Sequence, residues 1–222
     1  YKKSEKLIVI HQSINKKKIN LNKKKKLISF VGKLNSAKGY DIFGKTIIKI
    51  LNKYPDWSAN VIGDEPREEF NFNHKKLNLL GFKKHKDVLL NFEKTSIAVV
   101  CSRWNEPFGR TSLEASSRGC GVIISNRGGL PETITNGIIL KELSTRSLFK
   151  EIENLIKNPK KLKKLQTESL KNFTLNDHFI SKKIDECRRK NLKSIVYINK
   201  QNDLRNLKIL HVTNFNERHN GR

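Results

Sequence analysis

The chain has 222 residues and carries 46 Lys and Arg against 21 Asp and Glu, a formal net charge of +25 at pH 7. A chain of this length can bury about 70% of its extended surface, which is enough for a packed core. No run approaches the roughly 18 apolar residues of a membrane-spanning helix, and the three cysteines lack the C-x-x-C spacing of a metal or redox pair. The charge leaves three interpretations open: a general lysine-rich composition, attraction to a membrane surface or anionic substrate, and nucleic-acid binding.

Strand-like and helix-like segments alternate along the sequence. Apolar, β-rich runs predict strands at 27–32, 58–63, 77–80, 96–101, 121–125 and 137–140. Helical patterns lie between and after them, at 40–53, 86–94, 108–118, 145–158, from Pro159 onward, and at 175–191. Strands separated by helices predict an α/β fold with a Rossmann-like, doubly wound parallel sheet.

Polar and glycine-containing segments follow the predicted strands. They read KLNSAKG, GDEP, GFKKH, RWNEPFG and NRGGLPE. In doubly wound sheets, ligands bind outside the carboxyl ends of the strands. We therefore expect these five segments to meet on one face and to form the binding site.

Residues 106–132, EPFGRTSLEASSRGCGVIISNRGGLPE, place two glutamates eight positions apart around a strand-to-helix turn. The free N–H groups and the dipole of a helix that begins there favour an anion, so the amides near Phe108, Gly109 and Arg110 are candidate phosphate donors. Glu114 lies about six residues into the predicted helix, roughly 9 Å along its axis. That reach suits a hydroxyl one unit away from a phosphate, and we assign Glu114 to a ribose.

This pattern resembles the donor-binding half of the retaining glycosyltransferases of the GT-B fold, family four. The resemblance covers about residues 6–191 and includes three further segments in the family's order. VGKLNSAKGYD is similar to the family's GR-L-x-x-x-K-G, VIGDEP to its V-G-x-G-P, and LLGF to its L-G turn. The resemblance implies the nucleotide-sugar half of a GT-B fold, with a UDP- or GDP-sugar as the substrate and no cofactor.

The resemblance also assigns side chains to parts of the donor. Glu106 would accept hydrogen bonds from hydroxyls of the transferred sugar, while Lys33 and Lys38 would stabilise the diphosphate leaving group. The family usually has Arg at the position of Lys33, and lysine cannot provide the bidentate fork of a guanidinium. Arg110 and Thr111 are further phosphate candidates. The alternative for each is an ordinary solvated side chain, which for the glutamates is favourable near a helix start.

Other candidates are weaker. Gly128 and Gly129 permit close approach of a ligand, but a tight turn explains them nearly as well. The backbone around Phe82 and Lys83 is a candidate contact for the base. No D-x-D pair is present, so we expect binding without a divalent metal. The catalytic acid or base stays unknown, because in the resembled family some catalytic groups belong to an N-terminal acceptor domain that we expect to be missing here.

Four segments are expected along the chain. Residues 1–26 resemble an interdomain connection with a first strand, 27–191 are the donor domain, and 192–206 are a linker. Residues 207–222 resemble the first strand of a following glycosyltransferase unit, although an ordinary terminal strand of the same sheet is the alternative. This order predicts a piece of a longer polypeptide with tandem units, which alone would bind donor without transferring sugar.

The sequence thus predicts part of a retaining, metal-independent hexosyltransferase that moves a sugar to a glycan, lipid or saccharide hydroxyl, as in cell-envelope polysaccharide biosynthesis. One alternative is a sugar-nucleotide epimerase or phosphorylase of the same fold, and another is a polyanion- or nucleic-acid-binding module supported by charge alone. We expect a nucleotide-sugar donor, a glycan or lipid-linked acceptor and the acceptor domain as partners, and no nucleic acid. The cysteines and the lack of a signal-peptide profile favour a cytoplasmic location, with the inner face of the membrane as a candidate contact.

Overall fold

The structure is a computed structural model that describes residues 8–15 and 17–199. Six strands form one sheet: β1 (Lys25–Val31), β2 (Ser58–Ile62), β3 (Leu77–Leu79), β4 (Thr95–Val100), β5 (Gly121–Ser125) and β6 (Ile138–Leu140). Their order is β3-β2-β1-β4-β5-β6, and every neighbouring pair is parallel. The predicted α/β class with a parallel sheet is confirmed.

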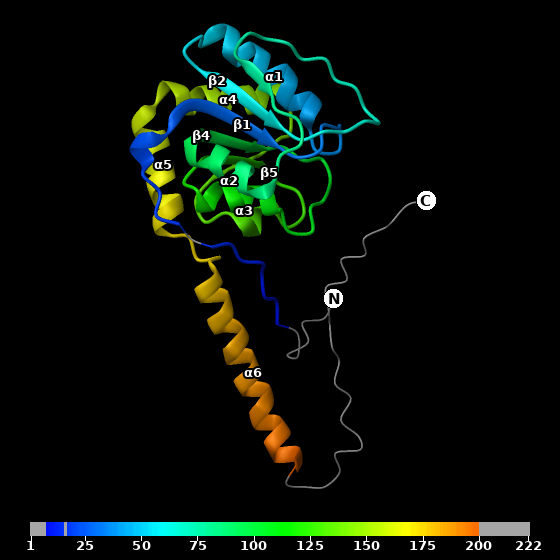
Figure 1. The fold of residues 1–222 in the computed structure, drawn as a ribbon, viewed down its shortest axis with the longest axis vertical. Helices are drawn as coiled ribbons and strands as arrows, with labels where there is room; N and C mark the ends of the chain where they lie inside the picture. Colours follow the sequence, from blue (N-terminus) through cyan, green and yellow to red (C-terminus); the bar gives the residue numbers. More distant parts are fainter. Residues whose placement is uncertain (1–7, 16, 200–222) are drawn as a thin grey trace. The chain divides into compact units, whose positions relative to one another are not determined.

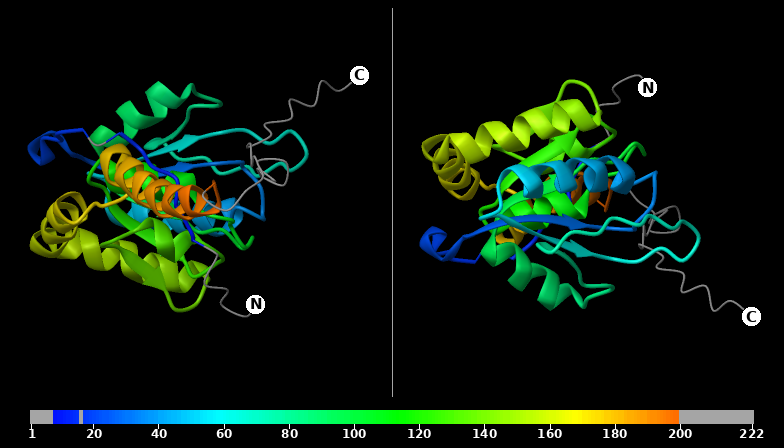
Figure 2. Two further views of the ribbon diagram at one scale, coloured as in Figure 1. Left: turned by 90° about the horizontal axis from the view of Figure 1, so that it is seen from below. Right: turned by 90° about the horizontal axis from the view of Figure 1, so that it is seen from above.

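Helices cover both faces of this sheet, as the predicted doubly wound fold requires. The helices α1 (Tyr40–Lys53) and α4 (Thr145–Lys157) lie on one face, and α2 (His85–Lys94) and α3 (Arg110–Ser117) lie on the other (Figure 1). Seen from above, α1 and α4 run beside each other across the sheet (Figure 2). The helix α5 (Pro159–Lys171) and two 3-10 helices, η1 (Leu21–Lys23) and η2 (Leu130–Thr133), complete the connections, and α6 (Asp177–Asn199) follows.

The two helical layers explain why the central strands are apolar throughout. Successive residues of a strand point to opposite faces, so Ile97 and Val99 of β4 join the core beneath α1 and α4, while Ala98 joins the core beneath α2 and α3. In β5 the buried residues Ile123 and Ile124 divide in the same way. The central strands β4 and β5 therefore each contribute to two cores, and an unbroken apolar run is the sequence pattern expected of such strands.

Several boundaries differ from the sequence prediction. The helix α3 begins at Arg110 rather than at 108, because Gly109 has a φ of +97° and occupies the turn before the helix. Residues 8–15 form no strand, and Ile14 makes a single parallel bridge with Asn176. The short helix η2, which begins at Leu130 in the GGLPE segment, was not predicted. The helix α6 continues to Asn199, so residues 192–199 are helical where a linker was predicted.

The chain divides into two compact units, and the division falls inside α6, after Ser181. The first unit contains the sheet, and the second begins at Lys182. Residues 200–206 of the predicted linker and the predicted strand within 207–222 lie outside the described residues. Within the described part of the chain, no helix is long and apolar enough to cross a membrane.

Candidate functional site

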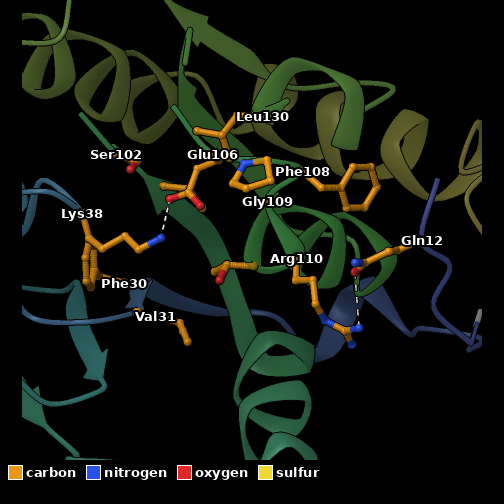
Figure 3. A pocket seen from close by; sticks show the side chains of 14 residues that line it. Gln12, Phe30, Val31, Lys38, Ser102, Glu106, Phe108, Gly109, Arg110 and Leu130 are labelled. Atoms are coloured by element: carbon orange, nitrogen blue, oxygen red, sulfur yellow. Dashed lines mark hydrogen bonds and ion pairs between the residues drawn. The ribbon is translucent and has the colours of Figure 1, made fainter. Parts of the chain in front are cut away.

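A pocket of about 350 Å³ opens at the carboxyl ends of β1 and β4. These strands are adjacent, but the chain continues from β1 toward β2 and β3 in one direction and from β4 toward β5 and β6 in the other. The pocket therefore lies at the topological switch point, where open α/β sheets bind their ligands. Its lining residues are Gln12, Phe30, Val31, Gly32, Lys38, Val100, Ser102, Glu106, Pro107, Phe108, Gly109, Arg110, Thr111 and Leu130 (Figure 3).

Backbone hydrogen bonds join the loops that leave the strands on this edge. The Gly32 amide donates to Ile62 O at 3.0 Å, and the Gly63 amide donates to Gly81 O at 3.0 Å. A Cβ atom at Gly63 would lie 1.8 Å from Gly32 O, so only glycine allows the first two loops to approach so closely. The predicted meeting of the motif segments on one face is confirmed by the parallel sheet order.

Lys38 and Glu106 form an ion pair inside the pocket. The Lys38 Nζ atom lies 2.5 Å from Glu106 Oε1, and the side chains are 33% and 11% exposed (Figure 3). The structure thus brings together two residues that the sequence assigned to different parts of the donor. A phosphate that binds the Lys38 ammonium would compete with the Glu106 carboxylate for it, since both are anions.

Arg103 fixes the loop that carries Lys38. Its guanidinium donates to both carboxylate oxygens of Asp41, at 2.6 and 2.7 Å, and to Ser36 O at 2.6 Å. This bidentate pair holds the pKa of Asp41 below its usual value, chiefly through the hydrogen bonds from Arg103. The backbone amide of Arg103 also donates to Ala37 O at 2.8 Å. Sequence reasoning missed Arg103, because its partners lie about 60 residues away along the chain.

The two glycines of the GGLPE loop, Gly128 and Gly129, support the backbone of Glu106 and do not themselves line the pocket, whereas Leu130 of the same loop does. The Gly129 amide donates to Glu106 O at 2.7 Å. A Cβ atom at Gly128 would lie 2.3 Å from Glu106 O, and one at Gly129 would lie 2.6 Å from Pro107 O. Close backbone packing therefore requires both glycines, and their effect on the site is indirect, through the position of Glu106.

The amino end of α3 forms the opposite wall of the pocket. Phe108, Gly109, Arg110 and Thr111, all named from the sequence, line it. Gly109 provides no side-chain cap for the helix, so the first-turn N–H groups have no capping oxygen from this residue. A helix amino end of this kind favours an anionic ligand group.

Glu114 is close to this wall but does not line the pocket. Because α3 begins at Arg110, Glu114 lies four residues along the helix, about 6 Å rather than the expected 9 Å. Its side chain is 8% exposed, and its Oε1 atom lies 3.0 Å from His85 Nε2 and 3.5 Å from Arg110 Nε. Both contacts use the same carboxylate oxygen. His85 was missed in the sequence, where nothing links it to a residue 29 positions away.

Lys33 and the amino-terminal segment differ most from the sequence assignment. Lys33 is exposed and lies outside the lining of the pocket. In contrast, the His11 ring stacks on Phe108 with a centroid distance of 5.3 Å, and the Gln12 Oε1 atom lies 3.5 Å from Arg110 Nη1. The His11 Nε2 atom also lies 3.6 Å from Glu132 Oε2. The segment that resembles an interdomain connection therefore contacts the pocket wall.

The described residues contain no cluster of three or more His, Cys, Asp or Glu side chains that could hold a metal ion. The expectation of metal-independent binding stays a prediction, because a metal can also be held by a ligand's phosphates.

Residues 11–172 match the family model described as Glycosyl transferases group 1. The chain belongs to this family. It is 32% identical over 158 residues to spore coat protein SA of Bacillus subtilis, a match that covers 64% of this chain and 42% of that protein. It is also 30% identical over 132 residues to the lipopolysaccharide core biosynthesis mannosyltransferase LpsB of Rhizobium meliloti, a match that covers 55% of this chain and 37% of that protein. The chain thus spans less than half the length of either relative.

Solved structures share the fold. The C-terminal domain of the group 1 glycosyltransferase LpcC from Francisella tularensis superposes with a TM-score of 0.59 at 28% identity, covering 65% of this chain and 82% of that one. Anabaena HepE, solved in complex with UDP and glucose, superposes with a TM-score of 0.63 at 20% identity, covering 74% of this chain and 48% of that one. These neighbours support a GT-B-like, Rossmann-type glycosyltransferase domain.

Proposed function

We propose that this chain is the donor-binding part of a retaining glycosyltransferase of family four, and that its pocket holds a UDP- or GDP-sugar without a divalent metal. The complete protein would transfer the sugar to a hydroxyl of a glycan, lipid or saccharide acceptor. That acceptor would lie against an N-terminal domain outside this chain. A cytoplasmic role in cell-envelope polysaccharide synthesis fits this chemistry.

The observation that carries the proposal is the composition of the pocket at the switch point. An uncapped helix amino end and the Lys38 ammonium lie on two sides of one cavity, and both favour a diphosphate. The carboxylate of Glu106 lies in the same cavity and can accept hydrogen bonds from sugar hydroxyls.

The other two candidate residues lie outside the lining of the pocket. Glu114 lies just behind the helix end, and its Oε2 atom accepts no hydrogen bond from a described residue, which leaves an acceptor suited to a ribose hydroxyl. Lys33 is exposed and does not line the pocket, so it is the weakest of the proposed donor contacts.

Titration calorimetry with UDP, GDP and UDP-glucose, each in the presence of a chelator, tests the proposal. We expect one of the nucleotides to bind with one site per chain. Binding that appears only after magnesium or manganese is added would refute the metal-independent site. No binding of any nucleotide or nucleotide sugar under either condition would refute the proposed function.

Two variants separate the roles of the glutamates. Glu114→Ala should weaken free nucleotide and nucleotide sugar alike, by about 10- to 150-fold if a hydrogen bond to a charged group is lost. Glu106→Ala should weaken the nucleotide sugar only. Because Glu106 pairs with Lys38, its removal releases the ammonium, and free UDP should bind the variant at least as tightly as the parent chain.

Glu142→Ala is the matched control, because Glu142 is exposed and lies outside the pocket. Equal losses of free UDP affinity in the Glu106 and Glu114 variants would contradict the two assignments. Analysis of the products formed by the complete protein would distinguish sugar transfer from epimerisation or phosphorolysis.

A further inference from the structure

The basic residues are unevenly paired in the first unit. On the edge that carries the pocket, four basic side chains pair with acids: Arg103 with Asp41, Arg67 with Glu65, Lys38 with Glu106, and Arg110 with Glu114. The exposed Lys33, Lys83, Lys84 and Arg127 of that edge form no ion pair with a described residue, but they are spread over three separate loops. The opposite edge, where the strands begin, is different. There the connections into the strands and the start of α5 form a surface we call the lysine edge, made of Lys17, Lys18, Lys23, Lys25, Lys26, Lys94, Lys157, Lys160, Lys161 and Lys163.

Contacts show that these lysines form one continuous surface. Lys25 lines a hollow with Lys94 on one side and a second hollow with Lys26 and Lys157 on the other. The Lys163 ammonium donates to Asn22 Oδ1 at 3.1 Å, which joins α5 to η1. Lys17, Lys18 and Lys23 line a further hollow beside η1. In Figure 1 the start of β1 and the helix α5 lie together at one end of the sheet.

The acids of this edge, Asp56, Asp87, Glu93 and Glu153, are fewer than its ten lysines. Asp56 already pairs with Lys26 at 2.5 Å, and Glu93 pairs with Lys17 at 2.8 Å. Glu153 is shared between Lys53 at 2.7 Å and Lys157 at 3.5 Å. No ion pair joins the following exposed lysines to any described residue: Lys18, Lys23, Lys25, Lys94, Lys160 and Lys161.

The chemistry of the edge indicates what it contacts. Arginine binds nucleic-acid phosphates through the bidentate fork of its guanidinium. Among the described residues of this edge the arginine is Arg118, and it is only 5% exposed, so it is not available to a phosphate. Its aromatic residues form no exposed ladder for stacking on bases, because Trp57 is 6% exposed and Tyr54 is half-buried. Exposed lysines around a hollow that is lined in part by Trp57, Leu155 and Leu162 instead suit a diffuse anionic surface with apolar material beneath it.

We propose that the lysine edge docks this domain on a bilayer containing anionic phospholipids. The pocket lies at the other end of the strands, about 23 Å away over the seven residues of β1. Docking therefore leaves the pocket open to the aqueous phase. It goes beyond the proposed donor-binding function and does not depend on it.

The test is co-sedimentation of the full 222-residue chain with vesicles of phosphatidylcholine, with and without phosphatidylglycerol, at low and at physiological salt. We expect binding to the anionic vesicles that weakens as salt rises, and no binding to phosphatidylcholine alone. In the edge variant, Lys23→Gln, Lys25→Gln and Lys161→Gln are combined. Since each lysine near an anionic surface contributes about fivefold, this variant should bind about 100-fold more weakly.

The matched control removes the same charge elsewhere, by combining Lys45→Gln, Lys49→Gln and Lys150→Gln on the exposed surfaces of α1 and α4. It should lose less than about fivefold. Equal losses in both triple variants would overturn the proposal, because total charge would then explain binding. So would a failure to bind anionic vesicles, or release of vesicle-bound protein by duplex DNA at equal phosphate concentration. If none of these chains bound UDP while the vesicle results were as expected, the proposed function would be refuted and the docking proposal would stand.

Discussion

Gly109→Ala tests how strictly the structure determines the backbone at the pocket wall. Gly109 has a φ of +97°, and a Cβ atom there would lie 2.5 Å from Leu130 Cδ2. Positive φ costs an L-residue about 1–2 kcal/mol. Ordinary carbon contacts are about 3.5–4.0 Å, so the fully buried Leu130 must move by about 1 Å, at about 1–3 kcal/mol for overpacking. The variant should therefore lose about 2–5 kcal/mol of unfolding free energy.

Gly81→Ala is the matched control for the backbone term. Gly81 has a φ of +64°, and a Cβ atom there would meet nothing within 4 Å. It should cost about 1–2 kcal/mol. The gain from a less flexible unfolded chain is the same for both substitutions and cancels in the comparison. The difference between the two variants, about 1–3 kcal/mol, is the packing cost at Leu130.

Urea unfolding followed by tryptophan fluorescence measures both values, because Trp57 is buried in the core and reports its loss. Gly109→Ala should also weaken UDP binding, since Gly109 precedes the helix whose amino end lines the pocket. Equal unfolding free energies for the two variants would refute the packing argument. Gly39→Ala extends the series of glycine variants. Its Cβ atom would lie 1.9 Å from the backbone oxygen of Cys101, which cannot move aside as a side chain can, so we expect little folded protein.

Three further predictions concern residues that support the site or the fold. Arg103→Gln should weaken UDP binding about tenfold with little change in the urea midpoint, because it loosens the loop that carries Lys38; unchanged affinity by calorimetry would contradict this role. Lys24→Met should lower the unfolding free energy by about 1–3 kcal/mol, since the Lys24 ammonium donates at 2.7 Å to both Phe92 O and Arg118 O. Burial lowers the pKa of Lys24, so the parent chain should gain stability as pH rises toward 10.5, and the variant should lack that gain. Hydrogen bonds from Lys53 and then Tyr54 lower the pKa of Glu153 to about 2, so the stability lost in Glu153→Gln should be present above pH 4.5 and should vanish as pH falls to about 2; a pH-independent difference in urea midpoints would exclude this linkage.

Local patterns in the sequence were sufficient to predict most strands and helices and the parallel class of the sheet, but the strand order comes from the structure. Neighbouring residues were enough to predict the central strands, from their apolar runs, and the helices α1 and α4, from their amphipathic spacing. Both patterns are short-range properties of the sequence. The segments between them carry glycine and polar residues that cannot continue a strand. Parallel order then brings those segments to one edge, which is why Lys38 and Glu106 could be named as neighbours of a common ligand before their 2.5 Å contact was seen.

The tertiary structure decided which side chains share an ion or a hydrogen bond. Glu114 contacts His85, and Arg103 contacts Asp41, through pairings across 29 and 62 residues that no local spacing encodes. Gly109 precedes the start of α3 with a φ of +97°, and Leu130 of the GGLPE loop lies where a side chain at Gly109 would be, a neighbour that no local spacing encodes. The lysine edge has the same origin. An excess of lysine spread along the sequence becomes one charged surface only when the folded chain brings the strand starts and the start of α5 together, since charge interactions depend on distance in space.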